Sequence, residues 1–105
     1  MPKTQAITLN PRQRAIVSGI LAAAQGRIGA VKVFGSRATG RARPASDLDL
    51  VVFEPAPPDE LARLRQAFDE SLLPITVDLV AWDRIDSAAM RAEIERDAVP
   101  WELGE

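Results

Sequence analysis

The sequence predicts an α/β (α+β) protein in which helices pack against a small mixed β-sheet, in the order α-β-loop-β-α-β-α. Short apolar runs rich in β-forming residues occupy positions 30–34, 48–53 and 75–81. Apolar residues at helical spacing fill the segments around them. The chain has 105 residues, which is enough for one modest core, so we expect a single domain over residues 1–105.

The first and last helices carry recognisable start and stop signals. The first is predicted to begin after Asn10, which can cap it, with proline at the first helical position. Gly26 is expected to end it, because glycine readily takes the conformation that follows a helix. The last helix is predicted to run from a cap at Asp86 or Ser87 to about Asp97.

The middle helix follows a rigid proline-rich linker at residues 54–58. Asp59 is expected to cap this helix, and Pro74 is expected to end it because proline cannot continue a helix. Its apolar residues recur every three or four positions and should face the core. These residues are Leu61, Leu64, Phe68 and Leu72.

The strands differ in how they are expected to lie in the sheet. Beyond its two aspartates, the run 48–53 is apolar on both faces, which predicts a central strand. The segment 35–46 is expected to be a loop with room for one helical turn. Trp82 and Trp101 are expected to pack along the sheet edge or the last helix, or alternatively to anchor a partner.

The composition excludes several kinds of chemistry. The chain has no cysteine and no histidine, so a bound metal would need oxygen ligands, which suit Mg²⁺, Mn²⁺ or Ca²⁺. The formal net charge is −2, so direct nucleic-acid binding is not expected. The apolar stretch at residues 15–25 is too short to span a bilayer and lacks the layout of a secretion signal, so we expect a cytoplasmic protein.

Three aspartates are candidate metal ligands. Side chains alternate along a strand, so Asp47 and Asp49 should share one face, with their Cα atoms about 6.5–7 Å apart. Two such carboxylates repel each other, whereas a divalent cation can bind between them. Asp78 lies in the middle of the third predicted strand. If that strand neighbours the second one, the three carboxylates form a cluster suited to Mg²⁺ or Mn²⁺.

A turn that could bind phosphate precedes the aspartates. Gly35 and Ser36 end the first apolar run, ten residues before Asp47. Glycine lets the backbone approach a ligand closely, and free N–H groups at the start of a helical turn bind phosphate oxygens. A Gly-Ser turn, an Asp-x-Asp pair or a loop with three arginines is, taken alone, typical of ordinary surface loops. Their combination at this spacing favours a metal–phosphate site.

These residues resemble the signature of the nucleotidyltransferase superfamily that includes DNA polymerase beta. The resemblance is strongest to its small stand-alone branch, the minimal nucleotidyltransferases. The signature consists of Gly-Ser, ten residues, Asp-x-Asp and a later acidic residue. Here it is met by Gly35-Ser36, Asp47-Leu48-Asp49 and Asp78. The resemblance covers about residues 10–97, which are the expected core of the domain.

The resemblance implies a polymerase beta-like palm in which successive strands are neighbours. It implies that Asp47, Asp49 and Asp78 bind catalytic Mg²⁺ or Mn²⁺, and that Asp78 helps to activate an acceptor hydroxyl. ATP would be the substrate, and AMP the group transferred. The candidate nucleotide-binding residues are Gly35, Ser36, Arg37 and Ser46.

The resemblance also implies a partner, because such proteins are often antitoxins of a helical HEPN-type toxin, an RNase that receives AMP in some cases. The chain has no tyrosine, so a tyrosine acceptor, as found in some relatives, would lie on the partner. Two other functions remain open. One is a non-catalytic module that neutralises its partner by contact, since relatives often carry arginine where Thr39 stands. The other is a transferase acting on small molecules such as aminoglycosides.

Overall fold

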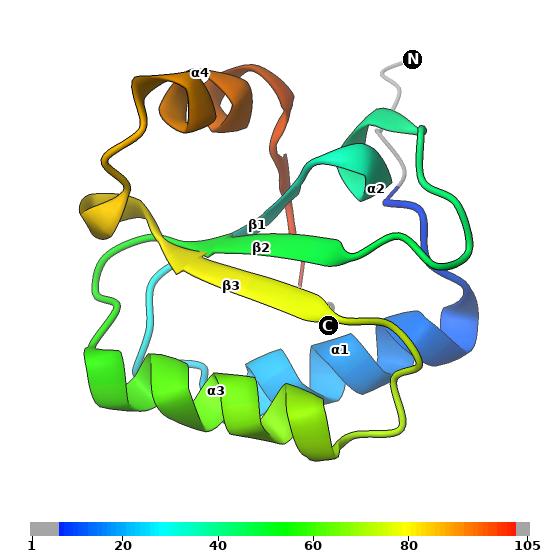
Figure 1. Ribbon diagram of the computed structural model, residues 1–105. Coiled ribbons are helices and arrows are strands. Elements are labelled where there is room, and N and C mark those ends of the chain that lie inside the picture. Colours follow the sequence, from blue (N-terminus) through cyan, green and yellow to red (C-terminus); the bar gives the residue numbers. More distant parts are fainter. Residues whose placement is uncertain (1–6, 103–105) are drawn as a thin grey trace.

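Within residues 7–102, the computed structural model is one four-stranded sheet with helices on both faces (Figure 1). The first six and the last three positions of the predicted domain lie outside the described residues. The predicted order of elements is confirmed, the single helical turn expected within residues 35–46 is α2, and two short elements are added: η1 and β4. In chain order the elements are α1 Pro11–Ala23, β1 Val31–Phe34, α2 Ser36–Thr39, β2 Leu48–Val52, α3 Pro58–Glu70, β3 Val77–Ala81, the 3₁₀ turn η1 Trp82–Arg84, α4 Ala88–Asp97 and β4 Val99–Pro100.

The sheet has the strand order β3-β2-β1-β4. β2 pairs antiparallel with β1 and parallel with β3, which confirms that it is a central strand. β4 pairs antiparallel with the outer edge of β1. With only two residues, one of them proline, β4 is too short to show a strand pattern, and for that reason the sequence does not predict it.

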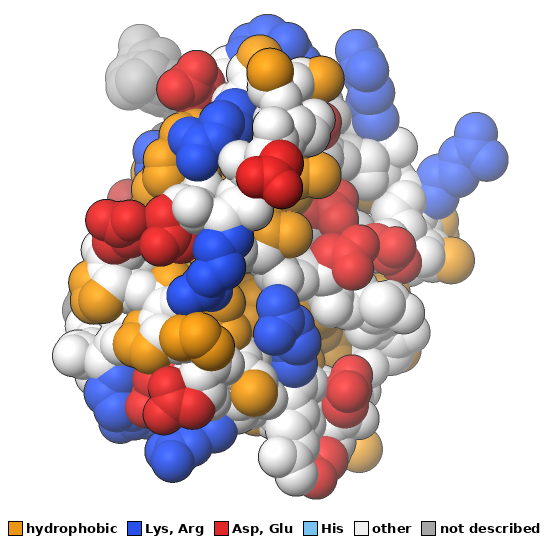
Figure 2. All heavy atoms as spheres, turned by 60° about the vertical axis from the view of Figure 1, so that its left-hand side comes forward, with side chains coloured by type: hydrophobic (Ala, Val, Ile, Leu, Met, Phe, Trp, Pro, Cys, Tyr) orange, Lys and Arg blue, Asp and Glu red, His pale blue; other side chains and the backbone are white. Residues whose placement is uncertain are grey.

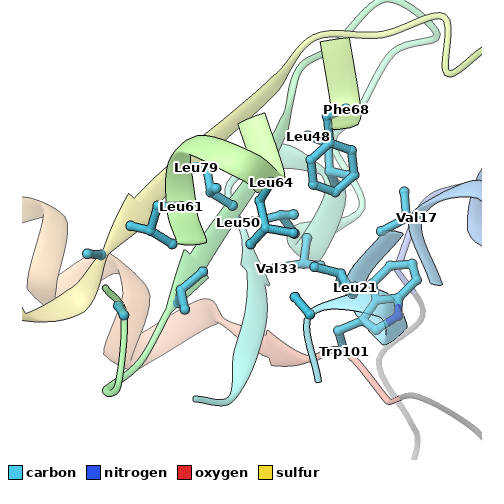
Figure 3. Close-up of a cluster of buried hydrophobic side chains, with 14 of the residues drawn as sticks. Val17, Leu21, Val33, Leu48, Leu50, Leu61, Leu64, Phe68, Leu79 and Trp101 are labelled. Carbon is cyan, nitrogen blue, oxygen red and sulfur yellow. The ribbon is translucent and has the colours of Figure 1, made fainter. Parts of the chain in front are cut away.

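The larger core lies between the sheet and the pair formed by α1 and α3 (Figure 3). Leu48 and Leu50 point from β2 into this core, and Leu61 meets them from α3. All three side chains are fully buried. Burying a leucine side chain of this kind stabilises the fold by about 1.5–3 kcal/mol. This face of the sheet is therefore filled by the larger core.

The opposite face of the sheet is covered mainly by α4, as Figure 1 shows. A smaller cluster of Phe34, Val51 and Ile94 packs there. Because side chains alternate along β2, Asp49 lies on the same side of the sheet as Val51. The candidate site is therefore placed beside α4. Within residues 7–102, no helix is both long enough and apolar enough to cross a membrane.

Two helix caps agree with the prediction. The side chain of Asn10 accepts a hydrogen bond from the Gln13 backbone, and the Gln13 side chain accepts one from the Asn10 backbone. This reciprocal pair caps the first turn of α1. At the start of α4, the Ser87 hydroxyl accepts a bond from the Met90 backbone. Of the two predicted cap residues for α4, the serine is the one used.

The start of α3 differs from the prediction. The sequence predicts Asp59 as the cap, but the cap is the extended Pro57, two residues earlier, and the helix begins at Pro58. Proline suits this position because it has no N–H to leave unpaired and its φ is already helical. Asp59 lies instead in the first turn, where its negative charge interacts favourably with the helix dipole.

The end of α3 corrects the predicted core. The helical spacing predicts Leu72 as a core residue, but its side chain is 77% exposed. The helix ends at Glu70, and the extended Ser71 donates both its N–H and its hydroxyl to the Phe68 carbonyl. This turn directs the next residue outward and buries Leu73 in its place. The third strand also begins later than predicted, at Val77.

Both tryptophans pack against their own chain. The Trp82 ring lies 5.2 Å from the Phe53 ring, and the Arg91 guanidinium lies over it at 4.4 Å. Trp101 is buried, and its indole N–H donates to the Ser18 hydroxyl at 3.2 Å. The expectation that they pack along the sheet edge or the last helix is confirmed, because Trp82 contacts α4 through Arg91 and Trp101 directly follows the edge strand β4.

Candidate active site

The Gly35–Ser36 turn joins β1 to α2. Gly35 has φ +74°, a conformation that residues with a side chain rarely adopt. A Cβ atom here would also collide with Oδ2 of Asp49. The carbonyl of Gly35 accepts hydrogen bonds from the Ala38 and Thr39 backbones, which closes the single turn of α2. The glycine is thus required both by the turn and by the neighbouring carboxylate.

The sheet brings two of the three predicted aspartates together. Asp49 and Asp78 are register partners across the parallel β2–β3 pair. Neighbouring strands lie about 4.8 Å apart, so two partners on one face are close neighbours. Asp49 is half-buried, whereas Asp78 is exposed because β3 is an edge strand. Asp47 immediately precedes β2 and is also exposed.

The electrostatics of Asp49 show that the acidic groups act on one another. Its pKa is raised from 3.8 to about 6, first by burial and then by the negative charges of Asp78, Asp47 and Glu93. A hydrogen bond with Asp78 adds to the shift and forms when one of the two carboxyl groups is protonated. All three predicted aspartates therefore belong to one electrostatic group, centred on Asp49.

Glu93 is a member of this group that the sequence does not predict. It lies on α4, whose neighbouring residue Ile94 packs on the same face of the sheet. Glutamate in a helix with mixed charges carries no signal of its own. Only the packing of α4 over β2 brings its charge near Asp49.

The donor set has the chemistry of a site for a hard cation. Carboxylate oxygens are the ligands that Mg²⁺ and Mn²⁺ prefer, and a cation near Asp49 would offset the repulsion that raises its pKa. Within residues 7–102, however, no group of three or more acidic side chains is arranged to hold a metal ion by itself. Oxygen atoms of a phosphate or of water would have to complete the coordination, as is usual for Mg²⁺.

Arg37 occupies a different place from the one expected of a nucleotide-binding residue. It is only 3% exposed, and its guanidinium donates to the backbone carbonyls of Thr8, Arg43, Pro44 and Ser46. These donors are directed into the protein rather than toward a phosphate beside the turn. We therefore leave Arg37 out of the phosphate-binding group proposed below.

Ser46 is also engaged with the loop. Its hydroxyl accepts a hydrogen bond from the Arg43 backbone at 2.8 Å, and its carbonyl accepts two bonds from Arg37. Arg41 and Arg43 have exposed side chains on the same loop. These two arginines therefore keep accessible positive charge on the loop that follows the turn.

A hollow of about 920 Å³ lies between α1, the end of α2 and the end of α4. Arg14, Thr39, Arg96 and Trp101 are among its lining residues, and the three aspartates are not. Asp47 and Asp78 are exposed and Asp49 is half-buried, so the acidic group beside α4 is accessible to solvent.

Comparison with known proteins shows to which family this chain is similar. The model of the nucleotidyltransferase domain family matches residues 15–101. A solved structure assigned as a minimal nucleotidyltransferase is 38% identical, with a TM-score of 0.65, and the match covers 85% of this chain and 92% of that one. A structure described as a toxin–antitoxin with AMP-PNP is 19% identical, with a TM-score of 0.67, over 88% of this chain and 74% of that one.

A curated relative, the "Probable protein adenylyltransferase MntA" of Haemophilus influenzae, is 52% identical over 54 residues. That match covers 50% of this chain and 47% of the relative, so it spans about half the length of that protein. The family model extends over most of the chain and includes the Gly-Ser turn and all three aspartates. This chain belongs to the nucleotidyltransferase domain family.

Proposed function

We propose that this protein is a metal-dependent nucleotidyltransferase that moves AMP from ATP to a hydroxyl group on a partner protein. The observation that carries the proposal is the pairing of Asp49 with Asp78 beside the Gly35 turn. Family membership supports nucleotidyl transfer. The name of the Haemophilus influenzae relative supports a protein acceptor, and the toxin–antitoxin structure with AMP-PNP supports ATP as the nucleotide.

In this proposal the three aspartates would hold Mg²⁺ or Mn²⁺ at the nucleotide. The bound ion would supply charge neutralisation at the phosphates. Gly35 and Ser36 bind the triphosphate through the turn. The acceptor oxygen forms a bond to the α-phosphorus, the bond to the bridging oxygen breaks, and pyrophosphate leaves. Asp78 takes the proton of the acceptor hydroxyl, because an exposed carboxylate beside the reacting group can serve as the base.

The partner in this proposal is a HEPN-type toxin, and this chain acts as its antitoxin in the cytoplasm. Asp47 and Asp78 are exposed in the described structure, so a second protein would cover the nucleotide and present the acceptor. The chain has no tyrosine, so a tyrosine acceptor would belong to that second protein. On the face shown in Figure 2, charges of both signs alternate with small apolar patches. That face has no broad basic surface suited to nucleic acid.

Neutralisation by contact alone is the second candidate function. It is favoured by one observation, namely that no three acidic side chains within residues 7–102 form a complete metal site. A module that only binds its partner would not need such a site. The two candidates differ in whether ATP is consumed.

The deciding experiment incubates the protein with α-labelled ATP, Mg²⁺ and the co-expressed partner. We expect label on the partner, and none with the double variant Asp47→Asn/Asp49→Asn, which should fold as well as the wild type because like-charge repulsion is relieved. Transfer that persists in the double variant would refute the assignment of the metal ligands. Absence of labelling, together with intact neutralisation of the partner, would favour the contact mechanism. An added aminoglycoside that becomes labelled while the partner does not would point to a small-molecule transferase.

A further inference from the structure

The loop between α2 and β2 is held by a single buried arginine. Arg37 donates five hydrogen bonds to four backbone carbonyls, at 2.7 Å to Thr8, 2.8 and 3.2 Å to Ser46, 3.1 Å to Pro44 and 3.2 Å to Arg43. It is 3% exposed, and no ion pair joins it to a carboxylate among the described residues. Burying a charge costs free energy unless its donors are hydrogen-bonded. Here each guanidinium nitrogen donates to a carbonyl of the surrounding backbone, so the question is what this arrangement holds in place.

The carbonyl that receives more than one of these bonds answers that question. The Ser46 carbonyl, which receives two of the five bonds, belongs to the same planar peptide unit as the N–H of Asp47. Asp47 itself lies outside β2, which begins at Leu48. On its other side the chain is held by the bond from the Leu48 backbone to the Thr76 carbonyl. The backbone on either side of Asp47 is thus fixed by the sheet and by Arg37.

We infer that Arg37 is a positioning residue that holds Asp47 in place relative to the Gly35–Ser36 turn. Arg37 belongs to α2 and directly follows Ser36, so its guanidinium ties the turn to the peptide before Asp47. The inference rests on the proposed function, in which Asp47 is a metal ligand. On this inference Arg37 positions Asp47 and does not itself contact the nucleotide.

Lysine should not replace this arginine. The planar guanidinium reaches carbonyls on two sides at once, whereas an ammonium group is a single point from which the same carbonyls cannot all be reached. A residue needed only for its positive charge near phosphate would tolerate lysine. A residue needed for its fork of donors would not, so Arg37→Lys separates the two roles.

The first measurement is backbone hydrogen exchange, which does not depend on activity. In Arg37→Lys, exchange in residues 40–47 should become at least about tenfold faster, while exchange in α3 should stay unchanged. Arg84→Lys is the matched control. The Arg84 guanidinium also donates to a backbone carbonyl, that of Ala56, at 2.9 Å, but away from this loop. Unchanged exchange of residues 40–47 in Arg37→Lys would overturn the inference, whatever happens to the activity.

The second measurement is Mn²⁺ affinity in a double-mutant cycle. Arg37→Lys should weaken Mn²⁺ binding about five- to tenfold in the wild type and less than about twofold in an Asp47→Asn background, because it acts through that carboxylate. Equal losses in both backgrounds would show that Arg37 acts elsewhere. A raised KM for ATP with unchanged Mn²⁺ affinity would instead indicate direct phosphate contact and overturn the inference.

A second variant and a second outcome cover the cases in which Arg37→Lys does not fold or the protein does not bind Mn²⁺. If Arg37→Lys does not fold, Arg37→Gln is measured instead, because an uncharged amide is easier to bury and still reaches fewer carbonyls than the guanidinium. It should show the same two signatures. If the wild type neither binds Mn²⁺ nor transfers AMP, the proposed function fails. The exchange of residues 40–47 then decides by itself whether Arg37 holds the loop.

Discussion

Gly35 shows how one residue can carry two independent constraints. Its positive φ excludes most side chains, and a Cβ would also strike the carboxylate of Asp49. Gly40 at the other end of α2 has a similar φ of +82°, but a Cβ atom there would meet nothing within 4 Å. The two glycines therefore separate the cost of the backbone conformation from the cost of the collision.

Gly40→Ala should lose about 1–2 kcal/mol of unfolding free energy, the usual cost of a left-handed conformation. Gly35→Ala should lose more than this and should also abolish transfer, because Asp49 must move. Denaturant unfolding and the labelling assay measure the two effects. Equal losses of stability and activity in the two variants would contradict the contact between Gly35 and Asp49.

The raised pKa of Asp49 makes stability depend on pH. The folded state binds the proton more tightly than the unfolded state, so this residue lowers stability as pH rises from about 4 to about 6, and the full cost is present above pH 6. Asp49→Asn should therefore stabilise the protein at pH 7.5 by an amount on the order of 1 kcal/mol, after allowance for solvent screening. The gain should vanish at pH 4, where the wild-type carboxyl group is neutral.

Thermal unfolding of wild type and variant at the two pH values checks this prediction. Asp69→Asn, at an exposed position on α3, is the control and should change the midpoint little at either pH. A stabilisation by Asp49→Asn that is equal at pH 4 and pH 7.5 would show that repulsion and burial of the charge are not its cause.

At the scale of elements, the exit from α3 decides which leucine is in the core. The sequence predicts a core position at Leu72 by continuing the helical spacing, but Ser71 turns the chain so that Leu73 is buried. Leu73→Ala should cost about 2–3 kcal/mol of unfolding free energy, and Leu72→Ala less than about 0.5 kcal/mol. Urea unfolding of the two variants measures both, and the reverse order would place the end of α3 elsewhere.

The helix α4 contributes to the electrostatics of the site through Glu93. Its negative charge is one of the causes that raise the pKa of Asp49. Glu93→Gln should therefore shift the acidic limb of the pH profile of transfer to lower pH, by a fraction of a unit, since burial and two other charges remain. Glu95→Gln, on an exposed position of the same helix, is the control. An unchanged profile in Glu93→Gln would remove α4 from the electrostatics of the site.

At the scale of the whole molecule, the larger core and the acidic group lie on opposite faces of the sheet. α1 and α3 bury the larger core, while the acidic group lies on the face that α4 covers in part. A partner that completes the site would have to approach this second face. Changes to the acidic group should then affect transfer without unfolding the protein.

Asp78→Asn tests this division. Asp78 is exposed on the edge strand β3, so the substitution should leave unfolding free energy within about 0.5 kcal/mol. It should lower transfer, because the proposed base is lost, and should leave binding of the partner intact. Labelling and co-purification with the partner are the measurements. Full activity in this variant would place the third acidic ligand at another residue.

The sequence by itself determined the approximate places of the three longer strands, the Gly-Ser turn and the two helix caps, because each depends on local spacing or on a single residue type. It could not determine the exit of α3, the two-residue β4 or the burial of Arg37, since these follow from contacts between distant segments. The tertiary structure alone decided that Asp49 and Asp78 are register partners and that α4 brings Glu93 near them. The physical reason is that strand order and helix packing arise from burying the whole core, and no local pattern in the chain contains that information.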